Sequence, residues 1–194
     1  MTTYTEATVT DPADQAALRI TRGWVDKAVI GLNLCPFAKA VQIKGQVRYV
    51  LSDANTEEAL LADLLHELEV LAEASPDKID TTLIVHPYVL NDFMAYNDFM
   101  DVADAALDER DLVGDIQVAS FHPDYEFADS PGGSIDNYTN RSPYPILHLL
   151  REESVTRAVD AFPDAADIYE KNIATMRELG VEGWDKLSAE FGND

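Results

Sequence analysis

Residues 117–151 read QVASFHPDYEFADSPGGSIDNYTNRSPYPILHLLR, and this stretch determines the predicted order of strands. It begins and ends with apolar runs, which predict strands over 115–123 and 145–150. The polar segment between them is long for a connection inside a compact domain, and such loops are usually functional or disordered. Because the segment contains aromatic residues and a single Arg, we interpret it as ordered and as one wall of a site.

Outward from this stretch, strands alternate with helices along the chain. The remaining predicted elements are strands over 46–52 and 81–87 and helices over 11–30, 36–42, 56–74, 92–110, 152–162, 164–179 and 183–191. Alternation of this kind predicts crossover connections and a largely parallel sheet. The strand over 145–150 follows its predecessor without an obvious helix, so it is the candidate for an antiparallel member.

We therefore expect an α/β fold with one layered domain over residues 11–191 and a flexible segment over 1–10. The domain is expected to contain a four-stranded, mostly parallel sheet flanked by helices, and to end in a helical C-terminus.

The chain of 194 residues is strongly acidic, with 36 Asp and Glu against 14 Lys and Arg and a net charge of −22. This balance argues against nonspecific binding to nucleic acid or to anionic membranes, both of which need a basic surface. The N-terminus lacks the basic start and apolar core of a signal peptide, and a lone cysteine excludes an internal disulfide framework. We expect a soluble, cytoplasmic protein, and the sequence leaves its oligomeric state and any cofactor open.

Two predicted strands end in the same dipeptide, His86-Pro87 and His122-Pro123. In open α/β sheets, ligands bind in the crevice outside the carboxyl ends of the strands. The two imidazoles are therefore expected to project into one cleft beside the long loop. The alternative is that each is a structural histidine hydrogen-bonded to backbone.

Further candidates lie near this predicted cleft or could reach it. Cys35 precedes a predicted short helix, where a thiolate is favoured, although a free cysteine is more commonly a small buried hydrophobe. Tyr125 follows His122 and could donate a proton. The turn over 140–142 (Asn140, Arg141 and Ser142) offers a planar cation and extra donors for an anion, or an internal ion pair with Asp124, Asp129 or Asp136. His148 lies within the last strand and could reach the edge of the site.

Several blocks of the sequence carry a family resemblance. These are GLNLCPFAKA (31–40), RYVLSDA (48–54), NDF and YNDF (within 91–99), VASFHPDYEFA (118–128) and NYTNRSPYPILHLLRE (137–152). They resemble an uncharacterised bacterial family with relatives in plants, the domain of unknown function 1415. The resemblance covers about residues 20–185 and implies membership, but no activity, cofactor or catalytic residue.

Three functions stay open on the sequence alone. The first is an enzyme acting on a small anionic metabolite, with Cys35, His86, His122 and Tyr125 as catalytic residues and Asn140, Arg141, Ser142 and His148 binding the substrate. The second is a metal protein that uses His86 and His122 with Cys35 or His148, although no local metal motif is present. The third is a noncatalytic domain that binds a small ligand or a partner protein.

Overall fold

Five strands form one mixed sheet in the computed structural model, which describes residues 3–130, 132–161 and 167–193. From one edge to the other the strands are β1 (Thr3–Thr5), β2 (Val47–Ser52), β3 (Thr81–Val85), β5 (Ile146–Arg151) and β4 (Ile116–Phe121). β2 and β3 run parallel, and each of the other neighbouring pairs runs antiparallel. The helices are α1 (Pro12–Trp24), the π-helix η1 (Val25–Ile30), α2 (Ala38–Ile43), α3 (Glu57–Glu73), α4 (Phe93–Glu109), the 3-10 helix η2 (Ile135–Thr139), α5 (Glu152–Asp160) and α6 (Ile168–Ser188).

The predicted α/β class is confirmed, but the four-stranded, mostly parallel sheet is a wrong detail. β5 inserts between β3 and β4 and is antiparallel to both. In its described part, residues 122–130 and 132–145, the connection contains the short helix η2 and no crossover helix of the kind that parallel neighbours need. The chain therefore returns in the opposite direction, as the missing helix in the sequence suggests.

The fifth strand comes from the segment that was expected to be flexible. Residues Thr3–Thr5 form β1 and pair antiparallel with Val50–Ser52 at the outer edge of β2. A strand of three residues is too short to show a period-2 pattern, so its sequence carries no signal of its own. Backbone pairing with the free edge of β2 orders it instead.

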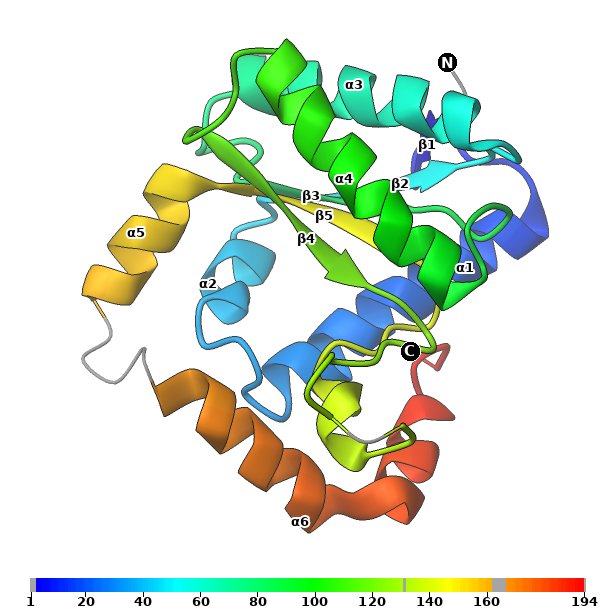
Figure 1. The fold of residues 1–194 in the computed structure, drawn as a ribbon, viewed down its shortest axis with the longest axis vertical. Coiled ribbons are helices and arrows are strands. Elements are labelled where there is room, and N and C mark those ends of the chain that lie inside the picture. Colours follow the sequence, from blue (N-terminus) through cyan, green and yellow to red (C-terminus); the bar gives the residue numbers. More distant parts are fainter. Residues whose placement is uncertain (1–2, 131, 162–166, 194) are drawn as a thin grey trace.

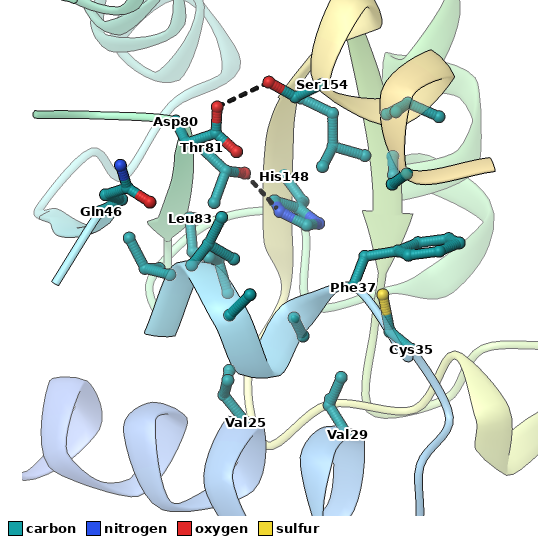
Figure 2. A pocket seen from close by; sticks show the side chains of 18 of the residues that line it. Val25, Val29, Cys35, Phe37, Gln46, Asp80, Thr81, Leu83, His148 and Ser154 are labelled. Carbon is teal, nitrogen blue, oxygen red and sulfur yellow. Dashed lines mark hydrogen bonds between the residues drawn. The ribbon is translucent and has the colours of Figure 1, made fainter. Parts of the chain in front are cut away.

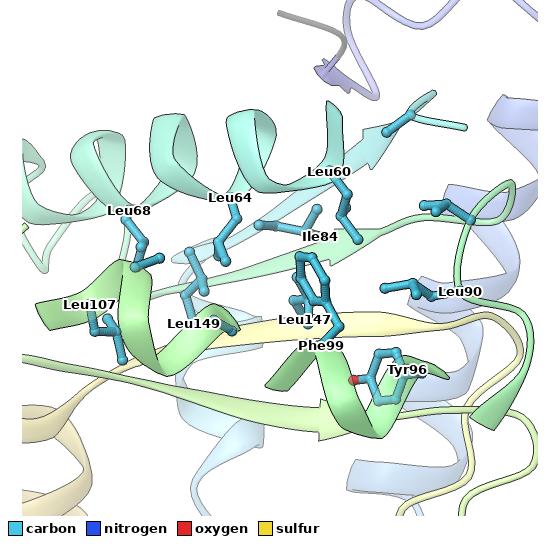
Figure 3. Close-up of a cluster of buried hydrophobic side chains, with 14 of the residues drawn as sticks. Leu60, Leu64, Leu68, Ile84, Leu90, Tyr96, Phe99, Leu107, Leu147 and Leu149 are labelled. Atoms are coloured by element: carbon cyan, nitrogen blue, oxygen red, sulfur yellow. The ribbon is translucent and has the colours of Figure 1, made fainter. Parts of the chain in front are cut away.

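α3 and α4 cover one face of the sheet (Figure 1). Figure 3 shows Leu60, Leu64 and Leu68 of α3 directed toward Ile84 and Leu147 of the sheet, and all five side chains are fully buried. Because fully burying such a side chain contributes roughly 1.5–3 kcal/mol, this layer is a main source of stability.

α1 and α6 lie on the opposite face, together with the end of the chain (Figure 1). Trp24 and Met176 pack there with Leu51, Val85 and Ile146, near the carboxyl ends of β2 and β3. This second core covers the sheet near those ends, and the part of the same face nearer the start of β3 is roofed by the short helices α2 and α5.

The helical C-terminus agrees with the prediction. α6 is interrupted at Gly180, whose φ of 66° is not helical, at the residue where the sequence predicts a helix to end. Residues 162–166, which include Pro163 and the predicted start of that helix, lie outside the described residues. No helix in the described part of the chain is long and apolar enough to cross a membrane.

Candidate functional site

A cavity of about 750 Å³ lies against the sheet, on the face opposite α3 and α4. Its floor is formed by β3, β5 and β4, and its walls come from η1, the segment leading into α2, and α5 (Figure 2). Its volume falls within the range of about 300–1,000 Å³ that is typical of small-molecule pockets. The residues that line it include Val25, Val29, Cys35, Phe37, Lys44, Gln46, Asp77, Asp80, Thr81, Leu83, Gln117, Ala119, Phe121, His148, Ser154, Arg157 and Ala158.

The alternation of side chains in β5 explains the floor. Leu147 and Leu149 belong to the core under α3 and α4, so His148 between them points to the other face. Across the strands, His148 stands opposite Leu83 of β3 and Ala119 of β4, and both of these also line the cavity. One imidazole therefore lies in the middle of an apolar floor.

The π-helix η1 shapes one wall. It continues α1 directly and places Val25 and Val29 against the cavity. The carbonyl of Val29 accepts hydrogen bonds from the N–H groups of Leu34, at 2.9 Å, and Cys35, at 3.3 Å. This turn brings Cys35 into the wall. π-helical turns are rare and occur frequently at functional sites, so their position here marks the cavity as a candidate site.

A hydrogen-bonded pair lies at the centre of the floor. The Thr81 hydroxyl is 2.6 Å from the carbonyl oxygen of Leu149 and 2.7 Å from Nε2 of His148 (Figure 2). A carbonyl oxygen only accepts, so the single hydroxyl hydrogen is donated to Leu149. The hydroxyl oxygen then accepts from Nε2–H of His148. The other ring nitrogen, Nδ1, makes no hydrogen bond with any described residue.

The imidazole of His148 is neutral at physiological pH. Removal from bulk water disfavours its charged form and lowers its pKa to about 4. A neutral imidazole with its proton on Nε2 keeps a lone pair on Nδ1. The floor therefore carries a hydrogen-bond acceptor among apolar side chains.

Cys35 lines the same cavity, and its thiol is the form favoured there. Burial raises the pKa of Cys35, although hydrogen bonds from the backbone N–H groups of Phe37 and Ala38 act in the opposite direction. The thiol form is a weaker nucleophile than the thiolate. Figure 2 shows Cys35 beside Phe37, on a wall of the cavity, while His148 lies on the floor.

The rim of the cavity is polar. Ser154 of α5 donates a hydrogen bond of 2.6 Å to the carboxylate of Asp80, which fastens α5 to the start of β3 (Figure 2). Lys44, Asp77 and Arg157 also line the opening and are exposed to solvent. Charges of both signs therefore surround the entrance, and the interior stays apolar.

His86 and His122 lie at the carboxyl ends of β3 and β4, as the sequence predicts, but neither lines this cavity. Both side chains are fully buried and contact the ring of Tyr96, with ring-centroid separations of 5.8 Å for His86 and 5.1 Å for His122. Nδ1 of His86 donates to the carbonyl of Val89, and Nε2 of His122 donates to that of Leu90. The structure brings the two histidines together as buried, backbone-bound side chains.

The residues of the long loop gather around His122. Its N–H donates to the carbonyl of Asn140 at 3.3 Å, and its own carbonyl accepts from the N–H of Ser142 at 3.4 Å. Tyr125 is linked to His122 through Phe93, which contacts both rings. These residues form a packed end of the sheet. None of them is among the residues that line the cavity.

Arg141 lies at the same end of the sheet. Its guanidinium stacks 4.2 Å over the ring of Tyr138, and Nε donates to the carbonyl of Tyr125 at 3.4 Å. Asp136, one of the predicted ion-pair partners, instead binds Arg177 at 2.6 Å. The side chain of Arg141 therefore fixes the loop through a carbonyl and an aromatic ring.

The described residues divide the predicted site into two places. Cys35 and His148 share the cavity, and the other candidates, His86, His122, Tyr125, Asn140, Arg141 and Ser142, lie at the end of the sheet. Within the described ranges, no three His, Cys, Asp or Glu side chains are grouped so that they could hold a metal ion. The roles predicted for these residues stay predictions.

Sequence reasoning missed three of the cavity's polar residues, namely Thr81, Asp80 and Ser154. Thr81 opens a strand and Ser154 lies in the first turn of α5, which begins directly after β5, and neither position has a distinctive pattern. The available signal was the single polar residue in the run PILHLL, which alternation places on the side opposite Leu147 and Leu149. Finding its partner would have required knowing that β3 lies beside β5.

Comparisons with known proteins give a family and no function. A family model described as "Protein of unknown function (DUF1415)" matches residues 16–186. No curated protein matches the chain. No solved structure matches it either.

Proposed function

The chain belongs to the DUF1415 family of unknown function, and we propose that it binds a small, largely apolar molecule in the cavity between the sheet, η1, α2 and α5. The observation that carries this proposal is a largely apolar cavity of about 750 Å³ with the hydrogen-bonded pair of Thr81 and His148 at the centre of its floor. Small-molecule sites have this composition, with apolar walls that supply affinity and a few placed polar groups that supply orientation.

The electrostatics of the cavity favour binding over nucleophilic catalysis. The raised pKa of Cys35 keeps its thiol protonated. The pKa of His148 is lowered to about 4, which makes this imidazole a weak base. Arg141, the predicted anchor for an anionic substrate, is not among the lining residues. An enzyme with a Cys, His and Arg site stays a prediction, and the third function expected from the sequence, small-ligand binding, is the one we adopt.

Naphthalene is a suitable first probe because it is neutral, apolar and lacks hydrogen-bonding groups. We expect saturation-transfer NMR to detect its binding to the native chain. Ala158→Trp, on the α5 wall, should weaken binding because the indole takes up part of the cavity. Ala105→Trp is the matched control, because Ala105 is an exposed alanine of α4 on the other side of the sheet.

The outcome is clear in either direction once circular dichroism confirms that both variants are folded. Weaker binding in Ala158→Trp alone places the ligand in the cavity. No binding to the native chain, or equal binding to both variants, rejects the proposal.

A further inference from the structure

We propose that the cavity selects ligands that carry a hydrogen-bond donor, a hydroxyl or an N–H group, which binds Nδ1 of His148. This inference rests on the proposed function and adds the chemical class of the ligand.

Thr81 determines which nitrogen of His148 carries the proton. Its hydroxyl oxygen lies 2.6 Å from the carbonyl oxygen of Leu149, and two oxygens at that separation need a hydrogen between them. The hydroxyl has one hydrogen, so toward Nε2 of His148, at 2.7 Å, it can only accept. Nε2 therefore bears the proton and Nδ1 bears the lone pair.

No described residue donates a hydrogen bond to the lone pair on Nδ1. Across the strands His148 faces Leu83 and Ala119, and the ring of Phe121 lies 5.9 Å away. None of these side chains donates a hydrogen bond. His148 is half-buried and its Nδ1 faces the cavity, so solvent can reach this nitrogen in the empty site. A ligand that displaces the solvent without supplying a donor leaves the acceptor unpaired, which costs free energy, so a ligand that supplies a donor gains relative to one that does not.

Two further donors that line the cavity are engaged elsewhere. Nε2 of Gln46 donates to the carbonyl of Pro76, at 3.2 Å, and Ser154 donates to Asp80. The remaining lining amide, Gln117, stands two residues along β4 from Ala119 and makes no hydrogen bond with a described residue. A variant at Gln117 is therefore a control for the role of His148.

An anionic head group does not suit the same position. A carboxylate or phosphate oxygen would meet the Nδ1 lone pair with its own lone pairs, in surroundings that already disfavour charge. Because the pKa of His148 is low, Nδ1 does not take up a proton at neutral pH and cannot become a donor to the anion. The floor therefore discriminates by the direction of the hydrogen bond, independently of ligand size.

The test compares three ligands that share one ring system: 2-naphthol, 2-methoxynaphthalene and 2-naphthoate. We expect 2-naphthol to bind about two- to tenfold more tightly than the methoxy compound by titration calorimetry, which is the range of one net hydrogen bond. The methoxy compound is the more apolar of the two, so simple hydrophobicity predicts the reverse order. 2-Naphthoate should bind most weakly.

Three variants test whether the preference depends on the lone pair at Nδ1 of His148. His148→Phe removes the acceptor and should abolish the preference for naphthol while naphthalene still binds. Thr81→Val removes the group that fixes the tautomer and should reduce the preference, with a change of the imidazole nitrogen shifts in long-range ¹H–¹⁵N spectra. Gln117→Met should leave the preference unchanged. Thr81→Val keeps the proposal testable if His148→Phe does not fold.

Failure of this inference is distinct from failure of the proposed function. If naphthalene binds but naphthol shows no advantage, or naphthoate binds most tightly, the donor rule is overturned and the cavity remains a binding site. The inference is also overturned if Gln117→Met removes the preference for 2-naphthol and the His148 and Thr81 variants do not. If naphthalene does not bind at all, the proposed function itself is rejected.

Discussion

The imidazole rings of His86 and His122, which directly follow β3 and β4, donate hydrogen bonds to two successive backbone carbonyls, those of Val89 and Leu90, at 3.1 and 3.2 Å. The two histidines thereby tie the turn that precedes α4 to the ends of β3 and β4. Nδ1 of His122 also accepts from the N–H of Asp124, at 3.0 Å, so both of its nitrogens are used. Nε2 of His86 is buried and makes no hydrogen bond with any described residue.

This arrangement predicts a loss of stability in mild acid. Burial lowers the pKa of His86 to about 4, although the hydrogen bond to Val89 acts in the opposite direction. In the unfolded chain the group titrates near 6.5. As the pH falls from about 6.5 to about 4, the unfolded state takes up a proton that the folded state lacks, so the free energy of unfolding decreases by about 3 kcal/mol from this group.

Urea unfolding at several pH values measures this contribution. His86→Asn keeps an N–H near the position of Nδ1 and does not titrate, so the variant should lose less stability than the native chain between pH 7 and pH 5. Equal pH slopes for the two proteins would show that His86 contributes nothing to acid sensitivity.

The hydroxyl of Tyr96 is expected to be a local source of stability at the same end of the sheet. It donates to the carbonyl of Ile146 at 2.7 Å and accepts from the N–H of Phe121 at 3.1 Å, which bridges β5 and β4 where they diverge. Tyr96→Phe leaves both backbone groups without this partner. We expect the free energy of unfolding to fall by about 1–3 kcal/mol. Tyr169→Phe, at a side chain that is 57% exposed, is the control and should change little.

Gly23 allows the C-terminal tail to approach α1. A Cβ built at this position would lie 1.8 Å from the carbonyl oxygen of Phe191, so Gly23→Ala should displace the tail. The ring of Phe191 contacts Trp184 at 5.9 Å, and displacement should therefore change tryptophan fluorescence as well as lower the melting temperature.

A truncation tests the cause of the Gly23→Ala effect. If the clash with the tail is responsible, the substitution should have little further effect in a chain that lacks residues 189–194, because the two changes act on one contact. Full additivity of the two losses would contradict this explanation.

The sequence predicted the strands and missed how they are arranged. Apolar runs predicted β2 to β5 to within a few residues. Each of these strands has at least five residues, which is long enough for an apolar run to be recognised in the sequence. The position of β5 between β3 and β4 depends on pairings across 67 residues, such as that of Thr81 with His148, and no local pattern encodes them.

The same insertion explains why the cavity is not where the histidines suggested. The rule that ligands bind outside the carboxyl ends of strands assumes an open crevice between them. Here the incoming segment before β5 occupies that crevice, since the carbonyl of Pro145 accepts from the N–H of His86 and that of Asn140 accepts from the N–H of His122. The cavity lies instead against one face of the sheet, where His148 forms part of its floor.

Cys35 offers a direct report on occupation of the cavity because it is the chain's one cysteine. Since burial raises the pKa of the thiol, alkylation by iodoacetamide at pH 7 should be slower than that of an exposed cysteine and should accelerate as the pH rises. Bound naphthalene should slow it further by covering the wall. Mass spectrometry of the intact chain follows the reaction at this single site.

The matched control carries Cys35→Ser together with Ala105→Cys, which moves the thiol to an exposed position on α4. Its alkylation should be fast and indifferent to naphthalene. Because the carbamidomethyl group occupies part of the cavity, alkylated native chain should also bind naphthalene more weakly, whereas Cys35→Ser, which removes the reactive atom and little volume, should bind it normally. Rapid labelling of Cys35 that naphthalene does not slow would mean that the thiol is activated and outside the ligand's reach, which would favour the nucleophilic role over the binding role.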